Sequence, residues 1–341
     1  MAYTTEAQNL VKTFTVDESG KGLLGAVKAL FSTKKRIIHA VENVSFGIGQ
    51  GEFVGYVGEN GAGKSTTIKI LTGILVPTGG VARVNGVVPY ENRQANGLNI
   101  GVVFGQRTQL WWDLPVRESF EILRVIYRVS KGDFDATMAR LTKGLGLEGL
   151  MEMPVRKLSL GQRMRCDIAA SLVHRPAVLF LDEPTIGLDV LAKENIRSFL
   201  RELNGKDGTT IILTTHDMND IEQLCKRLII LDKGRIIHDG PTDELKKRFP
   251  HDKIIEVDFE DEVTQLPLVP ELEPIRREGK KMWLRHAHDP SGLALAIGKL
   301  ASLYPVKDLS VREPSVEIII RSIYERTASL PEYAPDGKAG R

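Results

Sequence analysis

The sequence is poor in cysteine and has no long apolar run. Its 341 residues include two cysteines, Cys166 and Cys225, far apart and outside any cluster of cysteine and histidine. This argues against a zinc site and a disulfide framework, and is typical of a reduced cytosolic protein. No apolar stretch approaches the ~20 residues of a membrane-spanning helix, and residues 1–6 lack the charged and apolar regions of a signal peptide. We therefore expect any work at a membrane to be done from its side, through a partner.

An excess of charge is missing as well. The chain has 46 Lys and Arg against 44 Asp and Glu, a net charge of +2, so its charge gives no support to nucleic acid as a partner. Hydrophobic residues make up 42% and charged residues 26%, which is ordinary for a soluble globular protein. The length suits one large domain with a small one, or two medium ones.

A phosphate-binding loop is the strongest local signal. Residues 58–65 read G-E-N-G-A-G-K-S and fit the pattern G-x-x-x-x-G-K-[ST]. Glycines let such a loop turn tightly and direct its N–H groups at phosphate oxygens, while Lys64 can reach the β- and γ-phosphates and Ser65 can bind Mg²⁺. The apolar run 53–57 predicts a strand before the loop, and 66–71 predicts a helix after it. An ordinary glycine-rich turn is the alternative, which this context disfavours.

Apolar patterning predicts an α/β domain around the loop. Buried or half-buried strands are expected at 5–14, 41–48, 100–104, 177–183 and 210–215, and hairpins at 81–88 and 228–237. Helices are expected at 118–129 and 134–141 in an insert, and at 190–203, capped by Asp189 and ended by Gly205. A turn at 240–241 leads into a last short helix at 243–248. Residues 22–31 predict an amphipathic helix, either packed on its own domain or lying on a membrane surface.

The part after Pro250 predicts a smaller α+β unit. Its strand candidates are 254–259 and 316–320, and its helix is 293–303. The domain assignment is therefore 1–249 for a nucleotide-binding domain with a helical subdomain at 107–175, 250–328 for an accessory domain, and 329–341 for a disordered tail.

Polar residues gather where the predicted strands end. Asp182 and Glu183 close an apolar strand, Gln106 follows another, and His216 follows a third. Because doubly wound sheets collect ligands at the carboxyl ends of their strands, these residues are expected to meet. Asp182 can hold Mg²⁺, Glu183 can polarise the attacking water, Gln106 can sense the metal and that water, and His216 can donate to the γ-phosphate.

In this order the motifs resemble the nucleotide-binding subunit of ATP-binding-cassette (ABC) transporters, over roughly residues 5–248. The correspondence is 58–65 with the Walker A loop, Gln106 with the Q-loop, 158–162 with the signature, 178–182 with Walker B, Glu183 with the catalytic glutamate, 187–189 with the D-loop and His216 with the switch histidine. The resemblance implies a P-loop NTPase cassette, with a mixed, largely parallel sheet and a helical subdomain, plus the small α+β domain.

The resemblance also implies ATP and Mg²⁺ as ligands and assigns their contacts. Catalysis is assigned to Glu183, His216 and Gln106, and the metal to Ser65, Gln106 and Asp182. Nucleotide contacts are assigned to Phe14, which stacks on adenine, and to Gly58, Asn60, Gly61, Gly63, Lys64, Ser65, Thr66, Ser159, Gly161, Gln162 and Asp189.

One signature position departs from the family pattern L-S-G-G-Q. Leu160 stands where the family has glycine, which puts the local backbone geometry and the ATPase rate in question. In this family the signature faces the nucleotide of a second subunit. The resemblance therefore implies a homodimer or heterodimer that encloses two ATP molecules, and membrane permease subunits as further partners.

A further resemblance concerns the direction of transport. Residues 311–317 are similar to the end of ATPase subunits from drug and antibiotic exporters. Together these likenesses favour an exporter motor on the cytoplasmic side of the membrane, peripheral through its permease. Trp111 and Trp112 then lie in the groove that meets the permease, or else in the core of the helical insert. The competing functions are a soluble cassette ATPase for DNA repair or the ribosome, and a regulatory module without turnover.

Overall fold

The computed structural model describes residues 3–17, 35–105, 107–248, 253–263, 269–286 and 292–312, and also 316, 317, 319, 320, 323 and 324. The chain divides into two compact units, Met1–Thr242 and Asp243–Arg341. In the described residues the first unit has two sheets and the second has one, and each unit has its own core. Three sequence expectations lie outside the described residues: the helix at 22–31, the position of Gln106, and the tail at 329–341.

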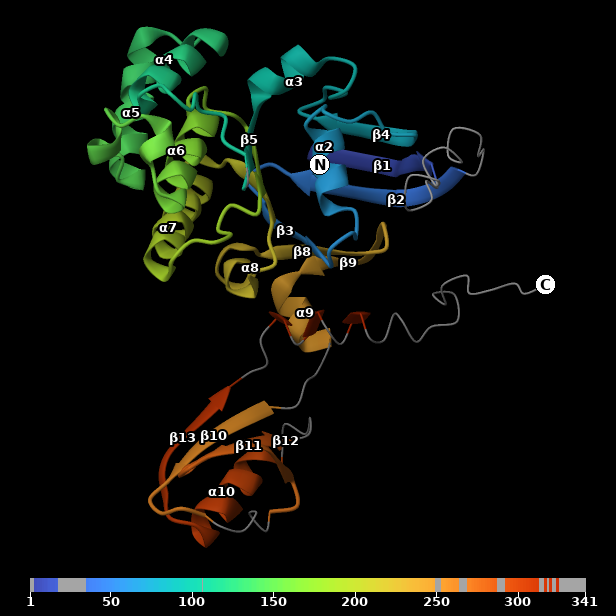
Figure 1. Ribbon diagram of the computed structural model, residues 1–341. Coiled ribbons are helices and arrows are strands. Elements are labelled where there is room, and N and C mark those ends of the chain that lie inside the picture. Colours follow the sequence, from blue (N-terminus) through green and yellow to red (C-terminus); the bar gives the residue numbers. More distant parts are fainter. Residues whose placement is uncertain are drawn as a thin grey trace, which may run out of the picture. The chain divides into compact units, whose positions relative to one another are not determined.

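A six-stranded sheet carries the larger unit (Figure 1). In spatial order its strands are β5 (Ile100–Phe104), β6 (Val178–Asp182), β7 (Thr210–Thr214), β3 (Phe53–Gly58), β8 (Arg227–Asp232) and β9 (Arg235–Pro241). All neighbours pair in parallel except β8 and β9, which form an antiparallel hairpin. The apolar residues of β6 and β7 are buried, as expected of parallel strands covered on both faces.

A second sheet is antiparallel and has three strands. They are β2 (Lys35–Gly49), β1 (Tyr3–Asp17) and β4 (Gly79–Val84), in that spatial order. Helix α2 (Lys64–Leu71) buries Ile68, Ile70 and Leu71 in one core cluster with residues of both sheets. The helix that follows the phosphate loop is therefore held by apolar packing, and this packing fixes the position of the loop.

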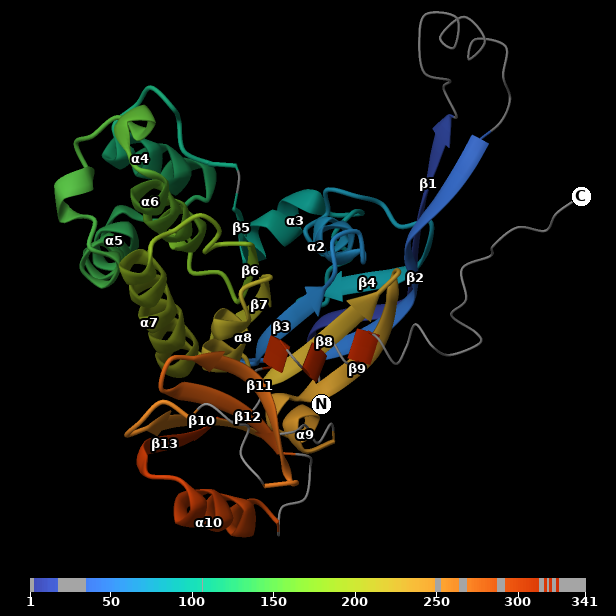
Figure 2. The same cartoon turned by 60° about the horizontal axis from the view of Figure 1, so that its bottom comes forward.

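Three helices lie between β5 and β6 in the described part of the chain. They are α4 (Val116–Ile126), α5 (Lys131–Leu145) and α6 (Leu160–Leu172), with single 3₁₀ turns at Glu148–Leu150 and Val155–Lys157. Figure 2 shows α4 and α5 to one side of the two sheets, while α6 packs against β5 of the six-stranded sheet. Helices α3 (Arg93–Asn99), α7 (Val190–Asp207) and α8 (Met218–Leu224) also belong to the larger unit.

The smaller unit is a four-stranded antiparallel sheet with one helix. Its strands lie in the order β11 (Leu272–Glu278), β12 (Lys281–His286), β10 (Lys253–Phe259), β13 (Val306–Arg312). Helix α10 (Leu293–Leu303) buries Ala296 and Leu300 in one cluster with alternate residues of β10 and β12. Helix α9 (Thr242–Arg248) precedes this sheet in the chain. The expected fold class, a P-loop α/β cassette with a small α+β domain, is confirmed.

Two predicted strands are wrong. The expected hairpin at 81–88 has its Asn85-Gly86 turn, with φ of 49° and 75°, but Val87 forms only a single bridge with Val84. The chain meets Pro89 two residues later, and proline has no N–H with which to extend a ladder. At 316–320 the described residues are helical, because Val316, Ile319, Ile320 and Ile323 are buried at the spacing of one helix face.

Several predicted boundaries also move; the helix expected at 134–141, for example, is longer and spans Lys131–Leu145. Helix α7 runs through Gly205 to Asp207, and Gly208 ends it with a left-handed φ of 64°. Helix α4 begins at Val116 and stops at Ile126 rather than Val129. Strand β9 continues through the expected turn at 240–241. Gly205 does not have the positive φ of a glycine that ends a helix, so it sits in an ordinary helical conformation and does not by itself stop the helix.

Candidate functional site

The phosphate loop is a tight turn between β3 and α2. Gly61 and Gly63 have φ of 88° and 104°, in the region that side chains other than glycine's rarely adopt. A Cβ on Gly63 would lie 2.3 Å from the carbonyl oxygen of Ala40, so no other residue fits there. Gly63 is also the N-cap of α2 and offers no side-chain cap, so the first amides of α2 remain available to an anion.

Lys64 supplies the positive charge of the loop. Its Nζ donates to the carbonyl oxygens of Gly58 at 2.6 Å and Glu59 at 3.0 Å. Burial lowers the pKa of this ammonium, while the carboxylates of Glu183 and Asp182 oppose that shift. Lys64 therefore lies between the loop carbonyls and the two carboxylates, where a phosphate would satisfy its charge.

Ser65, in the first turn of α2, lies beside Asp182, which ends β6. The Ser65 hydroxyl donates to Oδ1 of Asp182 at 3.4 Å, and the hydroxyl of Thr214 donates to the same oxygen. Within the described ranges, no group of three or more Asp, Glu, His and Cys side chains is placed to hold a metal ion. One hydroxyl and one carboxylate beside a phosphate loop suit Mg²⁺, which takes few protein ligands and completes its shell with water and phosphate oxygens.

Glu183 and His216 form a direct pair at the ends of β6 and β7. Nδ1 of His216 lies 2.7 Å from Oε2 of Glu183. Glu183 has a φ of 57°, an uncommon backbone conformation for a residue with a side chain. Its N–H donates to the carbonyl oxygen of Thr214 at 2.9 Å, and a Cβ on Gly105 would lie 2.2 Å from its carbonyl oxygen. The surrounding backbone therefore fixes the glutamate in this conformation.

Lys64, Glu183 and His216 line one hollow of about 580 Å³. Its described lining comprises Ala40, Asn60, Gly61, Gly63, Lys64, Ser65, Thr66, Glu183, Ile186 and His216. The structure thus brings together most of the predicted phosphate-loop residues with the predicted glutamate and histidine. Ala40 and Ile186 carry no sequence signal for this role, because only the fold brings them to the loop.

Phe14 and Asp182 line a neighbouring hollow of about 570 Å³, which also contains Ser65 and Glu183. Phe14 lies on β1 and is 37% exposed, with the Lys12 ammonium 5.2 Å from its ring centre. The aromatic side chain therefore lines the same hollow as Ser65 and Asp182 and is accessible to a ligand.

The predicted signature residues line neither hollow. Ser159 is the N-cap of α6 and shares a capping box with Gln162, so its side chain already holds the helix terminus. Leu160 is 37% exposed and lies against the D-loop, 3.0 Å from where a Cβ of Gly187 would be. Asp189 caps α7 by accepting from the N–H of Ala192 at 2.8 Å. The signature and D-loop therefore lie beside each other, and neither contributes to the described lining of the hollow around Lys64.

The segment after position 106 is fixed to the signature helix α6. Oδ1 of Asp167 accepts from the Thr108 hydroxyl at 2.8 Å and from the Gln109 N–H at 3.0 Å. Burial raises the pKa of the Asp167 carboxyl to about 6, against the lowering effect of these hydrogen bonds. The sequence shows Asp167 in a helix but gives no sign of these partners, 58 and 59 residues away.

Both tryptophans of this segment are accessible. Trp111 is 38% and Trp112 50% exposed, and the Arg163 guanidinium lies 5.7 Å from the Trp112 ring centre. The interpretation that both tryptophans are core of the helical insert is therefore wrong. On α4, Val125 and Ile126 add exposed apolar side chains.

Comparison with known proteins identifies the architecture. A family model described as ABC transporter matches residues 41–186. The Bacillus subtilis protein named ABC transporter ATP-binding protein NatA is 33% identical over 215 residues, covering 63% of this chain and 87% of NatA. The B. subtilis methionine import ATP-binding protein MetN is 33% identical over 238 residues, covering 65% of this chain and 69% of MetN.

A longer relative and a solved structure complete the comparison. The Escherichia coli protein named probable multidrug ABC transporter ATP-binding protein YbhF is 34% identical over 216 residues, and the match covers 63% of this chain but 36% of YbhF. A dimeric structure of the ATP-binding cassette MJ0796 bound to ADP and Pi aligns with a TM-score of 0.58 and 29% identity, covering 70% of this chain and 98% of that chain.

Proposed function

The chain belongs to the ABC transporter family, and we propose that it is the motor subunit of an exporter, dimerising around two ATP molecules and driving a separate permease. As a member of this family it binds ATP with Mg²⁺ and hydrolyses the nucleotide. The proposal rests mainly on the 2.7 Å contact between Glu183 and His216, which line the same hollow as the phosphate loop. Ser65 of that loop also lies beside Asp182.

We assign each residue of the site a role on the basis of its position. The first amides of α2 and the Lys64 ammonium bind the β- and γ-phosphates. Ser65 and Asp182 hold Mg²⁺, which when bound neutralises the charge that develops on the phosphoryl oxygens. Glu183 orients and polarises the attacking water, a contribution typically worth about 10²–10⁴ in rate. His216 orients the glutamate and, when it turns toward the nucleotide, donates to the γ-phosphate.

The position of the signature supports a dimer. Ser159 and Gly161 lie outside the hollow around Lys64, so they contact nucleotide only when it is presented by a second subunit. ATP bound between the phosphate loop of one subunit and the signature of the other stabilises the dimer, and hydrolysis followed by release of the products removes that stabilisation. The dimeric state of the MJ0796 cassette with ADP and Pi supports this arrangement.

The exposed tryptophans support docking on a permease. Trp111 and Trp112, with Val125 and Ile126 of α4, present apolar side chains that an isolated domain would normally bury. None of the helices in the described part of the chain has the length and apolarity to cross a membrane. We place the protein at the cytoplasmic face, attached through the permease. Export is favoured by residues 311–317 and by the multidrug name of YbhF, while the likeness to MetN is the opposing observation.

Hydrolysis of Mg-ATP by the full chain and by Glu183→Gln tests the proposal. We expect the wild type to hydrolyse ATP and the variant to lose about 10²-fold or more in kcat while it still binds nucleotide. Glu91→Gln is a matched control, because Glu91 is exposed and its replacement removes the same charge outside the site. Equal rates for Glu183→Gln and the wild type would refute the assigned role of the glutamate.

A further inference from the structure

A buried ion pair lies behind the pair of Glu183 and His216. Arg197 of α7 is 6% exposed and Asp220 of α8 is fully buried. Nε and Nη2 of Arg197 each lie 2.6 Å from Oδ1 of Asp220. Removing two charges from water is expensive, and such a pair often contributes little net stability compared with apolar residues of similar volume. The pair therefore invites an explanation other than stability.

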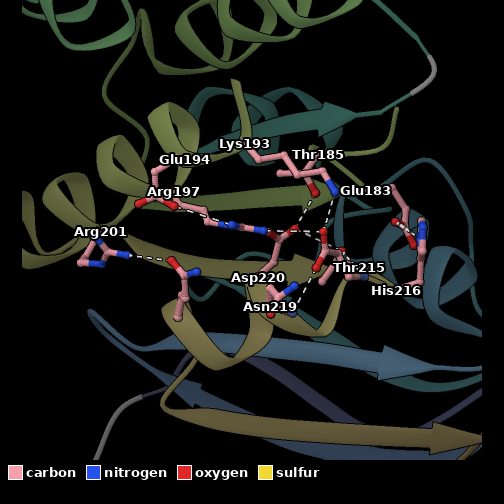
Figure 3. A network of polar contacts seen from close by, with 12 residues as sticks. Glu183, Thr185, Lys193, Glu194, Arg197, Arg201, Thr215, His216, Asn219 and Asp220 are labelled. Atoms are coloured by element: carbon pink, nitrogen blue, oxygen red, sulfur yellow. Dashed lines mark hydrogen bonds and ion pairs between the residues drawn. The ribbon is translucent and has the colours of Figure 1, made fainter. Parts of the chain in front are cut away.

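The second carboxylate oxygen of Asp220 accepts hydrogen bonds from two loops, the one that follows Glu183 and the one that carries His216. Oδ2 accepts from the hydroxyl of Thr185 at 2.5 Å and from that of Thr215 at 3.4 Å. Thr185 comes two residues after Glu183, and Thr215 immediately precedes His216. Figure 3 shows Arg197 approaching Asp220 from one side and the two threonines from the other. A single carboxylate thus ties the glutamate loop to the histidine loop.

The network extends along α7 toward its N-terminus. Asp217, the residue after His216, lies 2.6 Å from Nζ of Lys193 and 3.6 Å from Nη2 of Arg197. The N–H of Asp217 donates to the Thr215 hydroxyl at 3.0 Å. The start of α7, which Asp189 caps, is therefore fixed to the histidine loop by the same set of contacts.

We propose that Arg197 and Asp220 are positioning residues, which hold the loops of Glu183 and His216 at the separation that hydrolysis requires. This inference rests on the proposed function and extends it to residues outside the nucleotide site. Glu183 has a φ of 57°, and a non-glycine residue keeps such a conformation only where its surroundings over-determine it. The hydrogen bond from Thr185 to the paired Asp220 supplies one such constraint, two residues from the glutamate.

The smallest test is Thr185→Val, which removes one hydroxyl and leaves the ion pair in place. Thr137→Val is a matched control. Thr137 lies in α5 and is also buried, and its hydroxyl accepts a hydrogen bond from the Nε of Arg175 at 2.7 Å. We expect Thr185→Val to lower kcat for Mg-ATP about tenfold or more with KM within about threefold, since a misplacement near 1 Å can cost ~10²-fold. Thr137→Val should leave both values near those of the wild type. An unchanged kcat in Thr185→Val would overturn the proposal.

A double variant separates positioning from stability. Arg197→Met with Asp220→Leu replaces the buried pair by apolar side chains, a change that often preserves folding. Arg140→Met with Asp207→Leu is the control, because it removes an ion pair between α5 and the other end of α7. We expect the first variant to melt near the wild-type temperature, to hydrolyse slowly and, with Glu183→Gln added, to associate with Mg-ATP as Glu183→Gln does alone.

The outcomes distinguish this inference from the proposed function. A folded apolar pair with full kcat shows that the ion pair only supports the structure, and overturns the inference while the motor function stands. If the apolar double variant loses both kcat and Mg-ATP-dependent association, the network serves nucleotide binding rather than positioning, and the inference is overturned. A wild-type chain that does not hydrolyse ATP, and whose copies do not associate in its presence, overturns both the inference and the proposed function. If the double variant does not fold, the kcat of Thr185→Val alone decides.

Discussion

Replacing Asp167 by asparagine should make the protein more stable at neutral pH. The Asp167 carboxyl is 4% exposed, and burial raises its pKa from 3.8 to about 6. The folded protein therefore binds a proton at pH values where the unfolded chain has released it. The free energy of unfolding then falls as pH rises from about 4 to 6, and remains low above that range. A difference of about two pH units between the folded and unfolded pKa corresponds to about 3 kcal/mol.

The Asp167→Asn variant would not have this penalty, because its side chain stays neutral and its amide oxygen can accept the same hydrogen bonds from Thr108 and Gln109. We expect the variant to exceed the wild type by up to about 3 kcal/mol at pH 8 and by about half of that at pH 5. Urea unfolding of full-length chains without nucleotide measures both. Both chains carry Trp283→Phe, so that tryptophan fluorescence comes from Trp111 and Trp112 alone. Both of these lie in the unit that contains Asp167.

The comparison between the wild type and Asp167→Asn isolates the titration of the Asp167 carboxyl, since every other carboxyl is present in both proteins. Glu91→Gln serves as the control for loss of a negative charge at an exposed position. If Asp167→Asn is equally or less stable at pH 8, the ionised carboxylate stabilises the fold and its burial carries no penalty. A stability gain that does not change between pH 5 and pH 8 contradicts the assigned titration.

Three further substitutions test separate parts of the site. Gly63→Ala should strongly weaken Mg-ATP binding, measured by calorimetry, because its Cβ would meet the Ala40 carbonyl oxygen at 2.3 Å; unchanged affinity would refute the loop geometry. Phe14→Ala should weaken ATP binding about tenfold if the ring stacks on adenine, with the affinity for inorganic triphosphate unchanged. Trp112→Ala should preserve ATPase activity in solution and reduce its stimulation by the permease, and loss of both would indicate a role in folding.

Sequence patterns predicted the larger unit well where a pattern reports local chemistry. The apolar run ending in Asp182 and Glu183 identified β6, because a strand buried on both faces must be apolar throughout. The spacing of glycines with Lys64 identified the phosphate loop, because the positive φ of Gly63 leaves few alternatives. These features depend on a few adjacent residues and therefore remain visible in the sequence.

Features that depend on distant partners were not predictable in this way. Asp220 follows His216 by four residues and looks like an ordinary acidic residue in the first turn of α8, yet its partner Arg197 is 23 residues away. The strand expected at 316–320 failed because a short run of isoleucine and valine fits a buried strand and a helix face equally well. In both cases tertiary packing supplies information that local spacing lacks.

We propose that two copies of this chain enclose ATP between the phosphate loop of one and the signature of the other. Light scattering coupled to size-exclusion chromatography of Glu183→Gln, with and without Mg-ATP, tests it most directly. We predict a monomer that becomes a dimer only with Mg-ATP, with Leu160 compatible with a working signature. Nucleotide binding without any dimer, or a dimer that forms equally well without ATP, would contradict it.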